Sequence, residues 1–418
     1  MRILWSLPVR GENLGSGRGD LVRAKKLIEA LRVEGHEVRV VEYGTSTAVS
    51  AYRNILRDLL PHLPAMMIRD AGRWVASLGH AWRVQSQAMA FNSEAIVETQ
   101  VGFSFSGALA SRHTGLPMIL DDCSPSNEEK ILGSGMQCLA KHAVRFQAKA
   151  ASRIMATSPT IADHLVEEGV PRDKIQLLPN GVDLKAYRNQ AHKEARKRMG
   201  LKDHCVIGFA GSFQPWHATS LLMRALNELR NDSRWHLLLI GDGPELDSTL
   251  QKARHYGLED RITAMGSVHP DHVPEFISCF DIGVLPGSND YGHPMKLVEY
   301  GAAGASRIAP DLPPVRKLIM DEETGLLFKP GNLNDLVLKI QMLLNDETLR
   351  RKLMSQARRA ITVQDDWRMR ARELAGAIEP FLSGHFCRIQ PAMASNPGRL
   401  DANGAHGALK DQNVMGEQ

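Results

Sequence analysis

The sequence predicts an α/β protein with two doubly wound, Rossmann-like domains that face each other across a cleft. Three observations carry this prediction. Short apolar runs alternate with helical patterns, which is typical of chains that form parallel sheets. The alternation falls into two series, and the second begins near residue 204. The length of 418 residues exceeds what one ordinary core accommodates, so two domains are expected.

The first series opens with a strand-helix-strand unit. MRILWSL (1–7) has the composition of a strand, and DLVRAKKLIEALRVEG (20–35) has helical apolar spacing with a glycine as C-cap. HEVRVVEYG (36–44) is the next strand, and two strands joined through a helix lie parallel. The series continues with the strands EAIVETQ (94–100), PMILDDCS (117–124), RIMATSP (153–159) and KIQLLPNG (174–181), and with the helices FSGALASRHTG (105–115) and SPTIADHLVEEG (158–169).

The second series repeats this plan. The expected strands are CVIGFAG (205–211), HLLLIGDG (236–243), RITAMGSV (261–268), IGVLPG (282–287), SRIAPD (306–311) and TGLLFKPG (324–331). The expected helices are TSLLMRALNELRND (219–232), ELDSTLQKARHYGLED (245–260), VPEFISCFD (273–281), LVEYGAAGA (297–305) and LNDLVLKIQMLLND (333–346).

These patterns predict the domain boundaries. We expect a first domain at 1–183, a second domain at 184–364, and a last helix at 365–382 that packs back on the first domain. Residues 385–418 are rich in Gly, Asn and Ala and lack an apolar pattern, so a disordered tail is expected there.

Composition excludes several classes of protein. The five cysteines form no CxxC pair, which argues against a disulfide framework or a zinc site and favours a reducing cytoplasm. No long apolar window predicts a transmembrane helix, and the N-terminus lacks the apolar core of a signal peptide. The net charge of +4 lies entirely within residues 1–190. It is too weak for a nucleic-acid protein but suits an anionic partner or membrane surface near the first half.

The stretch YGHPMKLVEYGAAG (291–304) predicts a ligand site. It follows a strand that ends near Pro286, and its helix starts near Pro294, where free N–H groups and the helix dipole favour phosphate. Lys296 adds a positive charge, and Glu299 lies three residues on, where it can accept hydrogen bonds from ribose hydroxyls. A nucleotide is therefore the inferred ligand. The alternative is a surface ion pair, and the pattern alone does not separate the two.

Several ordered motifs resemble those of one known family. PMKLVEYGAAGASRIAPDLPPVRKLI (294–319) with GLLFKPGN (325–332) resembles the donor-site segment of family 4 glycosyltransferases of the GT-B fold. LLPNGVD (177–183), GFAGSFQPWH (208–217) and LLLIGDGPE (237–245) resemble other signatures of that family. The resemblance implies a retaining, metal-independent enzyme that moves a sugar from a nucleotide-sugar donor to an acceptor. It also implies that residues 1–183 are the acceptor-binding domain and residues 184–364 the nucleotide-sugar-binding domain. It also implies no cofactor besides this donor, which is the substrate, and no metal ligands.

Site residues follow from the resemblance one by one. Glu299 matches the second of the family's paired glutamates, the ribose ligand, whereas Tyr291 stands where the first is expected. Ser212 and His217 occupy positions where many members carry Arg and Lys, so His217 and Lys296 remain to meet the diphosphate. For His217 the alternative is a structural role beside Trp216. The complete expected donor site is Glu299, Tyr291, Gly292, His293, Pro294, Met295, Leu297, Ser212, Gly17, Arg18 and Ser267, and the expected catalytic residues are Lys296, His217 and Asp122.

The first domain supplies two of these expectations. In RGENLGSGRGD (10–20) the resemblance places Gly17 and Arg18 beside the donor diphosphate, and a solvent-exposed loop is the alternative. At the end of PMILDDCS, Asp122 is a candidate weak base toward the acceptor hydroxyl, and a turn or capping role is the alternative.

Partners and location are the last expectations. The basic, apolar stretch 65–91 is a candidate for peripheral contact with the inner face of the membrane, although most such helices pack on a sheet. A glycan or lipid-linked acceptor in cell-surface polysaccharide synthesis is the leading hypothesis, in a cytoplasmic enzyme that binds no nucleic acid. A sugar-nucleotide epimerase and a non-catalytic GT-B nucleotide-binding protein are the alternatives.

Overall fold

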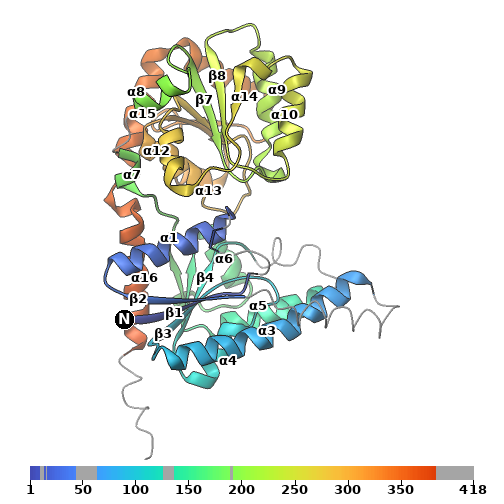
Figure 1. Ribbon diagram of the computed structural model, residues 1–418, viewed down its shortest axis with the longest axis vertical. Coiled ribbons are helices and arrows are strands. Elements are labelled where there is room, and N and C mark those ends of the chain that lie inside the picture. The colour runs from blue at the N-terminus through green and yellow to red at the C-terminus, as the bar shows by residue number, and fades with distance from the viewer. Residues whose placement is uncertain (10–13, 16, 44–63, 126–135, 189–191, 383–418) are drawn as a thin grey trace, which may run out of the picture.

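Two parallel six-stranded sheets, each covered by helices, make up the protein (Figure 1). This computed structural model describes residues 1–9, 14–15, 17–43, 64–125, 136–188 and 192–382. The two-sheet α/β architecture predicted from the alternating pattern is confirmed. The tail expected at 385–418 lies outside the described residues.

The first sheet has the strand order β2-β1-β3-β4-β5-β6, with every pairing parallel. Alternate residues of β1 point to opposite faces: Ile3 and Trp5 pack with helices α1 and α16, and Leu4 packs with helices α3 to α6. The strands are β1 (Arg2–Leu7), β2 (Glu37–Glu42), β3 (Ala95–Thr99), β4 (Met118–Asp122), β5 (Arg153–Ala156) and β6 (Ile175–Leu177). The helices are α1 (Gly19–Val33), α3 (Ala65–Ala90), α4 (Ser106–Thr114), α5 (Gln137–Ala150), α6 (Pro159–Glu167) and α16 (Trp367–Ile378).

The second sheet has the order β12-β11-β10-β7-β8-β9 and is also parallel. Its strands are β7 (Cys205–Ala210), β8 (Trp235–Ile240), β9 (Ile262–Ala264), β10 (Ile282–Val284), β11 (Ser306–Pro310) and β12 (Leu326–Phe328). Its helices are α7 (Leu184–Arg188), α8 (His192–Arg198), α9 (Thr219–Glu228), α10 (Leu246–His255), α11 (Val273–Ile277), α12 (Met295–Ala303), α13 (Pro313–Arg316), α14 (Leu333–Asn345) and α15 (Glu347–Ala360).

The strand order of the second sheet reverses between β7 and β10. The chain runs outward from β7 through β8 to β9 and then continues on the other side of β7 with β10. In open α/β sheets, ligands bind at such a switch point, beyond the carboxyl ends of the strands. The loops that follow β7 and β10 are therefore the first place to look for a site.

Helix α16 returns the chain to the first sheet after the second is complete. Trp367, Leu374 and Ile378 are buried in the same apolar cluster as Ile3 and Leu27. These contacts support the proposed assignment of residues 365–382 to the first domain.

Helix α12 begins at Met295, which confirms the start expected near Pro294 and lies two residues before the apolar run 297–305. It ends at Ala303, before the end of that run, because Gly304 adopts a left-handed conformation with φ 83° and terminates it. Lys296 and Glu299 thus both lie in its first two turns.

Candidate functional site

The loops that follow β7 and β10 touch each other at the switch point. A Cβ atom placed on Gly287, in the β10 loop, would lie 2.6 Å from the backbone oxygen of Trp216 and 2.7 Å from the Cβ of Ala218. Only glycine permits so close an approach. The contact aligns the short helical turn Pro215–His217 with the start of α12.

Lys296 and His217 meet across this junction. Lys296 Nζ lies 2.8 Å from His217 Nε2, and the lysine ammonium also lies 5.5 Å from the centre of the Phe209 ring. Burial, together with the nearby lysine, lowers the pKa of His217 to about 2. Burial lowers the pKa of Lys296 to about 8, and the Glu299 carboxylate acts in the opposite direction. The structure therefore unites the two residues predicted to face the diphosphate.

The imidazole of His217 cannot satisfy both of its neighbours. Its Nδ1 accepts the backbone N–H of Gln214 at 3.2 Å, and its Nε2 faces Lys296. A neutral imidazole has one nitrogen with a free lone pair, so it accepts a hydrogen bond from the Gln214 N–H or from the Lys296 ammonium, but not from both. A charged Lys296 is thus poorly compensated by the protein, and an anionic ligand oxygen would complete its surroundings.

Glu299 lies one turn further along α12 and is partly buried. The Tyr187 hydroxyl, from α7, donates a hydrogen bond to its carboxylate. Burial raises the pKa of Glu299, whereas the Tyr187 hydrogen bond and the charge of Lys296 lower it. The carboxylate is held in one orientation with acceptor capacity left over, since an ionised carboxylate has about four lone-pair sites.

The segment that precedes α12 is held by the first domain. The Tyr291 side chain is 3% exposed and packs in the apolar cluster that contains Ile161 and Ala162 of α6. Ser158 Oγ donates to the Tyr291 carbonyl at 2.5 Å, and Asn180 Nδ2 donates to the His293 carbonyl at 2.7 Å. In this arrangement the Tyr291 ring and carbonyl are engaged by the first domain rather than presented to a donor sugar.

Two other members of the predicted loop also have internal roles. The Gly292 N–H, expected to serve sugar or phosphate, donates instead to Asn289 Oδ1 at 2.8 Å. Burial lowers the pKa of His293 to about 3, so its imidazole is neutral. Pro294 is the N-cap of α12, where no side chain caps the helix, and Leu297 is fully buried. The first N–H groups of α12 remain the best phosphate donors of this loop.

A buried guanidinium links this loop to the first sheet. Arg23 of α1 binds Asp121, at the end of β4, at 2.9 Å, and donates to Asn180 Oδ1 at 2.9 Å. Asn180 in turn binds His293, so α1, β4 and the β10 loop form one polar chain. Neighbouring Asp122 is 2% exposed and accepts the backbone N–H of Ser124 at 3.3 Å. That contact favours the turn role of Asp122.

The remaining predicted residues lie at separate places. Arg18 is paired with Asp20 at 2.5 Å, at the start of α1, and Gly17 is exposed beside it. A Cβ atom on Gly19 would lie 3.9 Å from Met295 Cε, so the starts of α1 and α12 are neighbours. Ser267 lies in an exposed bend after β9, the edge strand.

The β8 loop accounts for the position of Ser212. Cβ atoms on Gly241 and Gly243 would come within 2.0 Å and 1.9 Å of the backbone oxygens of Gly211 and Ser212. Both glycines have positive φ, so GDGP serves as a tight turn beneath the β7 loop.

Three residues of this site were missed by the sequence reasoning: Tyr187, Asn180 and Ser158. Asn180 and Tyr187 lie in or just after LLPNGVD, the segment between the domains. An asparagine in a turn at a domain junction is a signal that could have identified the first of them.

Two family models match the chain, one in each half. The model described as Glycosyltransferase Family 4 matches residues 22–186, and the model described as Glycosyl transferases group 1 matches residues 204–346. The second match contains both loops and α12, and therefore the Lys296–His217 pair.

Curated relatives match over part of their length. A D-inositol 3-phosphate glycosyltransferase of Nocardia farcinica is 29% identical over 214 residues, which are 49% of this chain and 47% of the relative. An N-acetyl-alpha-D-glucosaminyl L-malate synthase of Bacillus anthracis is 24% identical over 223 residues, with coverage of 53% and 58%. The chain thus spans about half the length of these curated relatives.

Solved structures match over almost the whole chain. Anabaena Alr3699/HepE in complex with UDP-glucose has a TM-score of 0.71 at 17% identity and covers 91% of this chain and 100% of its own. Sucrose-phosphate synthase from Thermosynechococcus elongatus has a TM-score of 0.70 at 16% identity, with coverage of 92% and 100%. At this identity the likeness concerns the fold, and the predicted GT-B fold is confirmed.

Proposed function

The chain belongs to the family 4, or group 1, glycosyltransferases, and on that premise we propose that it transfers a sugar from a nucleotide-sugar donor with retention at the anomeric carbon. The observation that carries the proposal is the contact between Lys296 and His217 at the switch point of the second sheet. A UDP-sugar is the first donor to test, because UDP and UDP-glucose occupy the Anabaena structures that share this fold.

The donor diphosphate lies against the start of α12 in this proposal. The uncapped N-terminus of that helix and the Lys296 ammonium provide positive charge at one point. Negative charge grows on the diphosphate as the glycosidic bond breaks, so both groups stabilise the transition state more than the bound donor. This route uses fixed protein charge and does not call for a metal ion.

Lys296 supplies from the helix a charge that many members supply from the β7 loop. The loop position holds His217, which burial keeps neutral, and the lysine Nζ reaches its ring. His217 therefore positions the Lys296 ammonium, and in this proposal its neutral imidazole lies beside the phosphate as a hydrogen-bonding group. Ser212 and the backbone around it line the same loop, and Arg18 is a second cation that can approach from α1 if its pairing with Asp20 opens.

Glu299 binds the ribose hydroxyls in this proposal. Its carboxylate is oriented by Tyr187, and its distance of one helical turn from Lys296 matches the step from diphosphate to ribose. Ser267 lies at the far strand and is proposed to meet the base.

The acceptor is proposed to be a glycan or a lipid-linked sugar used in cell-surface polysaccharide synthesis, bound by the first domain near β4. Solved structures of the same fold include a glycosyltransferase involved in lipopolysaccharide biosynthesis, with a TM-score of 0.66. We also propose that Asp122 acts as a weak base toward the acceptor hydroxyl. We place the enzyme in the cytoplasm, at the inner face of the membrane.

Labelled nucleotide sugars test the proposal directly. Incubation with and without a lipid-linked acceptor, in buffer containing a chelator, should give a product only when the acceptor is present, and the product should keep the donor's anomeric configuration. A product without acceptor would indicate a sugar-nucleotide epimerase. Donor binding without any product would indicate a non-catalytic binding protein. An inverted product would refute retention.

A further inference from the structure

Trp216 is an exposed aromatic residue beside the Lys296–His217 contact. It lies in the short helical turn Pro215–His217 of the β7 loop and is 44% exposed, whereas the neighbouring His217 is 7% exposed. The rings of Trp216 and His217 are 5.9 Å apart and meet at 66°, so the indole does not stack flat on the imidazole. Single exposed aromatic residues are common on protein surfaces, and the conformation of the loop is what distinguishes this one.

The β7 loop has an unfavourable backbone conformation on both sides of Trp216. Phe213 has φ 41° and Ala218 has φ 50°, in the left-handed region that residues with a side chain rarely adopt. Strain of this kind persists only where the surrounding structure imposes it, and it is concentrated at sites that bind or transform ligands. The loop therefore holds a shape that local backbone preference opposes, and this shape buries His217 while it exposes Trp216.

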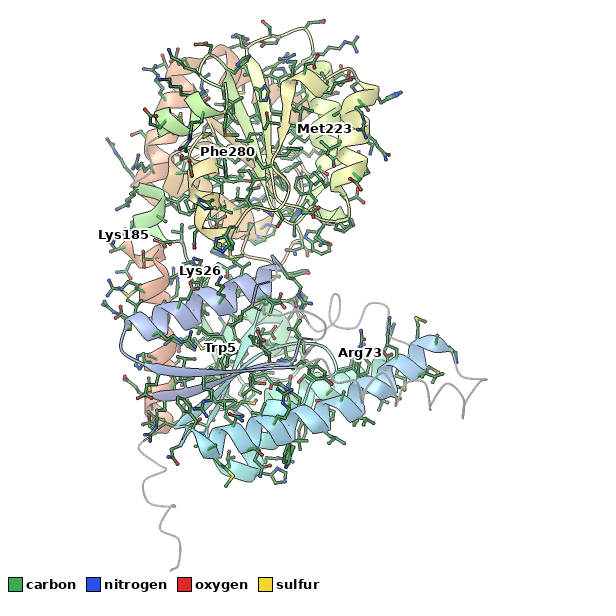
Figure 2. The ribbon with its side chains drawn as sticks, viewed as in Figure 1. Trp5, Lys26, Arg73, Lys185, Met223 and Phe280 are labelled. Atoms are coloured by element: carbon green, nitrogen blue, oxygen red, sulfur yellow. The ribbon has the colours of Figure 1, made fainter. Side chains whose placement is uncertain are left out.

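Contacts on three sides fix the strained loop. Gly287 of the β10 loop packs directly against the backbone oxygen of Trp216. The carbonyl of Phe213 accepts the backbone N–H of Glu245, from the β8 loop, at 2.9 Å. Met223, in helix α9 directly after the loop, is fully buried in the core of the second domain (Figure 2). The indole is thus presented from a preorganised backbone, which lowers the cost of ordering it when a ligand binds.

The transferred sugar of the donor has no contact among the residues assigned so far. Lys296 and His217 are proposed to meet the diphosphate, and Glu299 the ribose. Tyr291, which stands where a glutamate contact to the sugar is expected, packs in the apolar cluster of the first domain instead. Because the sugar is bonded directly to the diphosphate, it lies next to His217 in the proposed complex, and the Trp216 ring is the neighbouring aromatic surface.

We propose that Trp216 stacks on the pyranose ring of the donor sugar and replaces the polar contact that Tyr291 does not make. One face of a pyranose presents C–H groups, and the face of an indole ring carries partial negative charge, so the two surfaces attract each other and exclude water. Stacking recognises the shape of the ring rather than single hydroxyl groups, so the site takes a neutral pyranose. This inference rests on the proposed function, because it places a nucleotide sugar at Lys296.

Two other rings are possible partners of Trp216, and binding measurements separate them from the donor sugar. The nucleobase, proposed to lie near Ser267, would stack on Trp216 in UDP as well as in a UDP-sugar. An acceptor sugar would leave the binding of UDP and of UDP-sugar unaffected by Trp216. Only contact with the donor sugar makes the affinity for a UDP-sugar depend on Trp216 while the affinity for UDP does not.

Calorimetry of the full chain with UDP and with UDP-glucose tests the proposal. Trp216→Ala should bind UDP-glucose about tenfold more weakly than the parent, the effect of one aromatic stacking contact, and should bind UDP equally well. Trp216→Phe keeps an aromatic ring and should regain part of the loss. Tryptophan fluorescence of the parent should change with UDP-glucose more than with UDP, and Trp216→Phe should abolish this difference.

A matched control and the two ligands fix the interpretation. Trp82 of α3 is 69% exposed and lies in the first domain, so Trp82→Ala should leave the affinity for both ligands unchanged. UDP binding together with equal UDP-glucose affinity in the parent and in Trp216→Ala would overturn the inference alone. An equal loss for UDP and UDP-glucose would also overturn it and assign Trp216 to the nucleotide. Failure of the parent to bind either ligand would refute the proposed donor site and this inference with it.

Discussion

The segment from Asn289 to Glu299 serves two neighbours, and its two ends show how one loop can be divided between them. Tyr291 and His293, before the helix, are held by Ser158 and Asn180 of the first domain. Lys296 and Glu299, inside the helix, meet His217 and Tyr187 instead. The first end fixes where the domains sit, and the second presents charge to the proposed donor.

The contrast between the two ends explains why position 291 holds a tyrosine rather than the glutamate expected from the family. A glutamate at that position would place a carboxylate in an apolar cluster, at a large desolvation cost, whereas the tyrosine ring packs there and is 3% exposed. The position has therefore become a domain contact, and the proposed ligand-binding work rests on the three residues Lys296, His217 and Glu299.

Truncation of Tyr291 should weaken the contact between the segment that precedes α12 and the first domain. Tyr291→Ala removes a buried aromatic ring, so the free energy of unfolding should fall by about 3–5 kcal/mol, as measured by urea titration. Tyr291→Phe keeps the ring and serves as the control, with a change below about 1.5 kcal/mol. Equal loss in both variants would show that the hydroxyl, rather than packing, holds the loop.

Removal of Glu299 should weaken nucleotide binding and leave the contacts of Tyr291 and His293 with the first domain intact. Glu299→Ala should weaken binding of a nucleoside diphosphate by about 1.5–3 kcal/mol, the range for hydrogen bonds to a charged group, as measured by calorimetry. The free energy of unfolding should fall by about 1–3 kcal/mol, because the buried Tyr187 hydroxyl loses its acceptor. The control is Glu245→Ala on the β8 loop, and unchanged affinity in Glu299→Ala would contradict the ribose assignment.

The pH dependence of diphosphate binding should show whether Lys296 carries the charge that attracts the ligand. Burial lowers the pKa of Lys296 to about 8, and only its protonated form attracts a diphosphate. Affinity should therefore be level between about pH 7 and 8, where the terminal phosphate is fully ionised, and fall by about tenfold per unit above pH 8. His217 is neutral because its pKa is about 2, so it should not titrate in that range. Lys296→Arg keeps the charge at all these values and should remove the fall, whereas a fall that persists in this variant would assign it to another group.

Sequence reasoning predicted the two sheets well, and the place of the β10 loop and of α12 in the second unit, for a physical reason. Apolar runs such as CVIGFAG and LLLIGDG report burial directly, and the helices that connect successive strands indicate that the strands lie parallel. The meeting of Lys296 with His217 was also within reach, because parallel strands end at the same sheet edge. The pattern could not predict contacts between residues that are far apart in the chain, such as Ser158 with Tyr291 across the domains or Arg23 with Asp121 within the first domain.

The central claim is that Lys296 carries, from the helix, the positive charge that holds the donor diphosphate. Relocation of that charge tests it most directly, with UDP affinity measured by calorimetry for the parent, for Lys296→Met and for Lys296→Met/His217→Lys. Because Nζ and Nε2 are 2.8 Å apart, a lysine at 217 can place its ammonium at the same point. The single variant should bind UDP roughly ten- to a hundredfold more weakly, and the double variant should regain most of that loss, while uridine affinity stays constant throughout. Equal UDP affinity in all three proteins, or an equal loss for uridine, would contradict the claim.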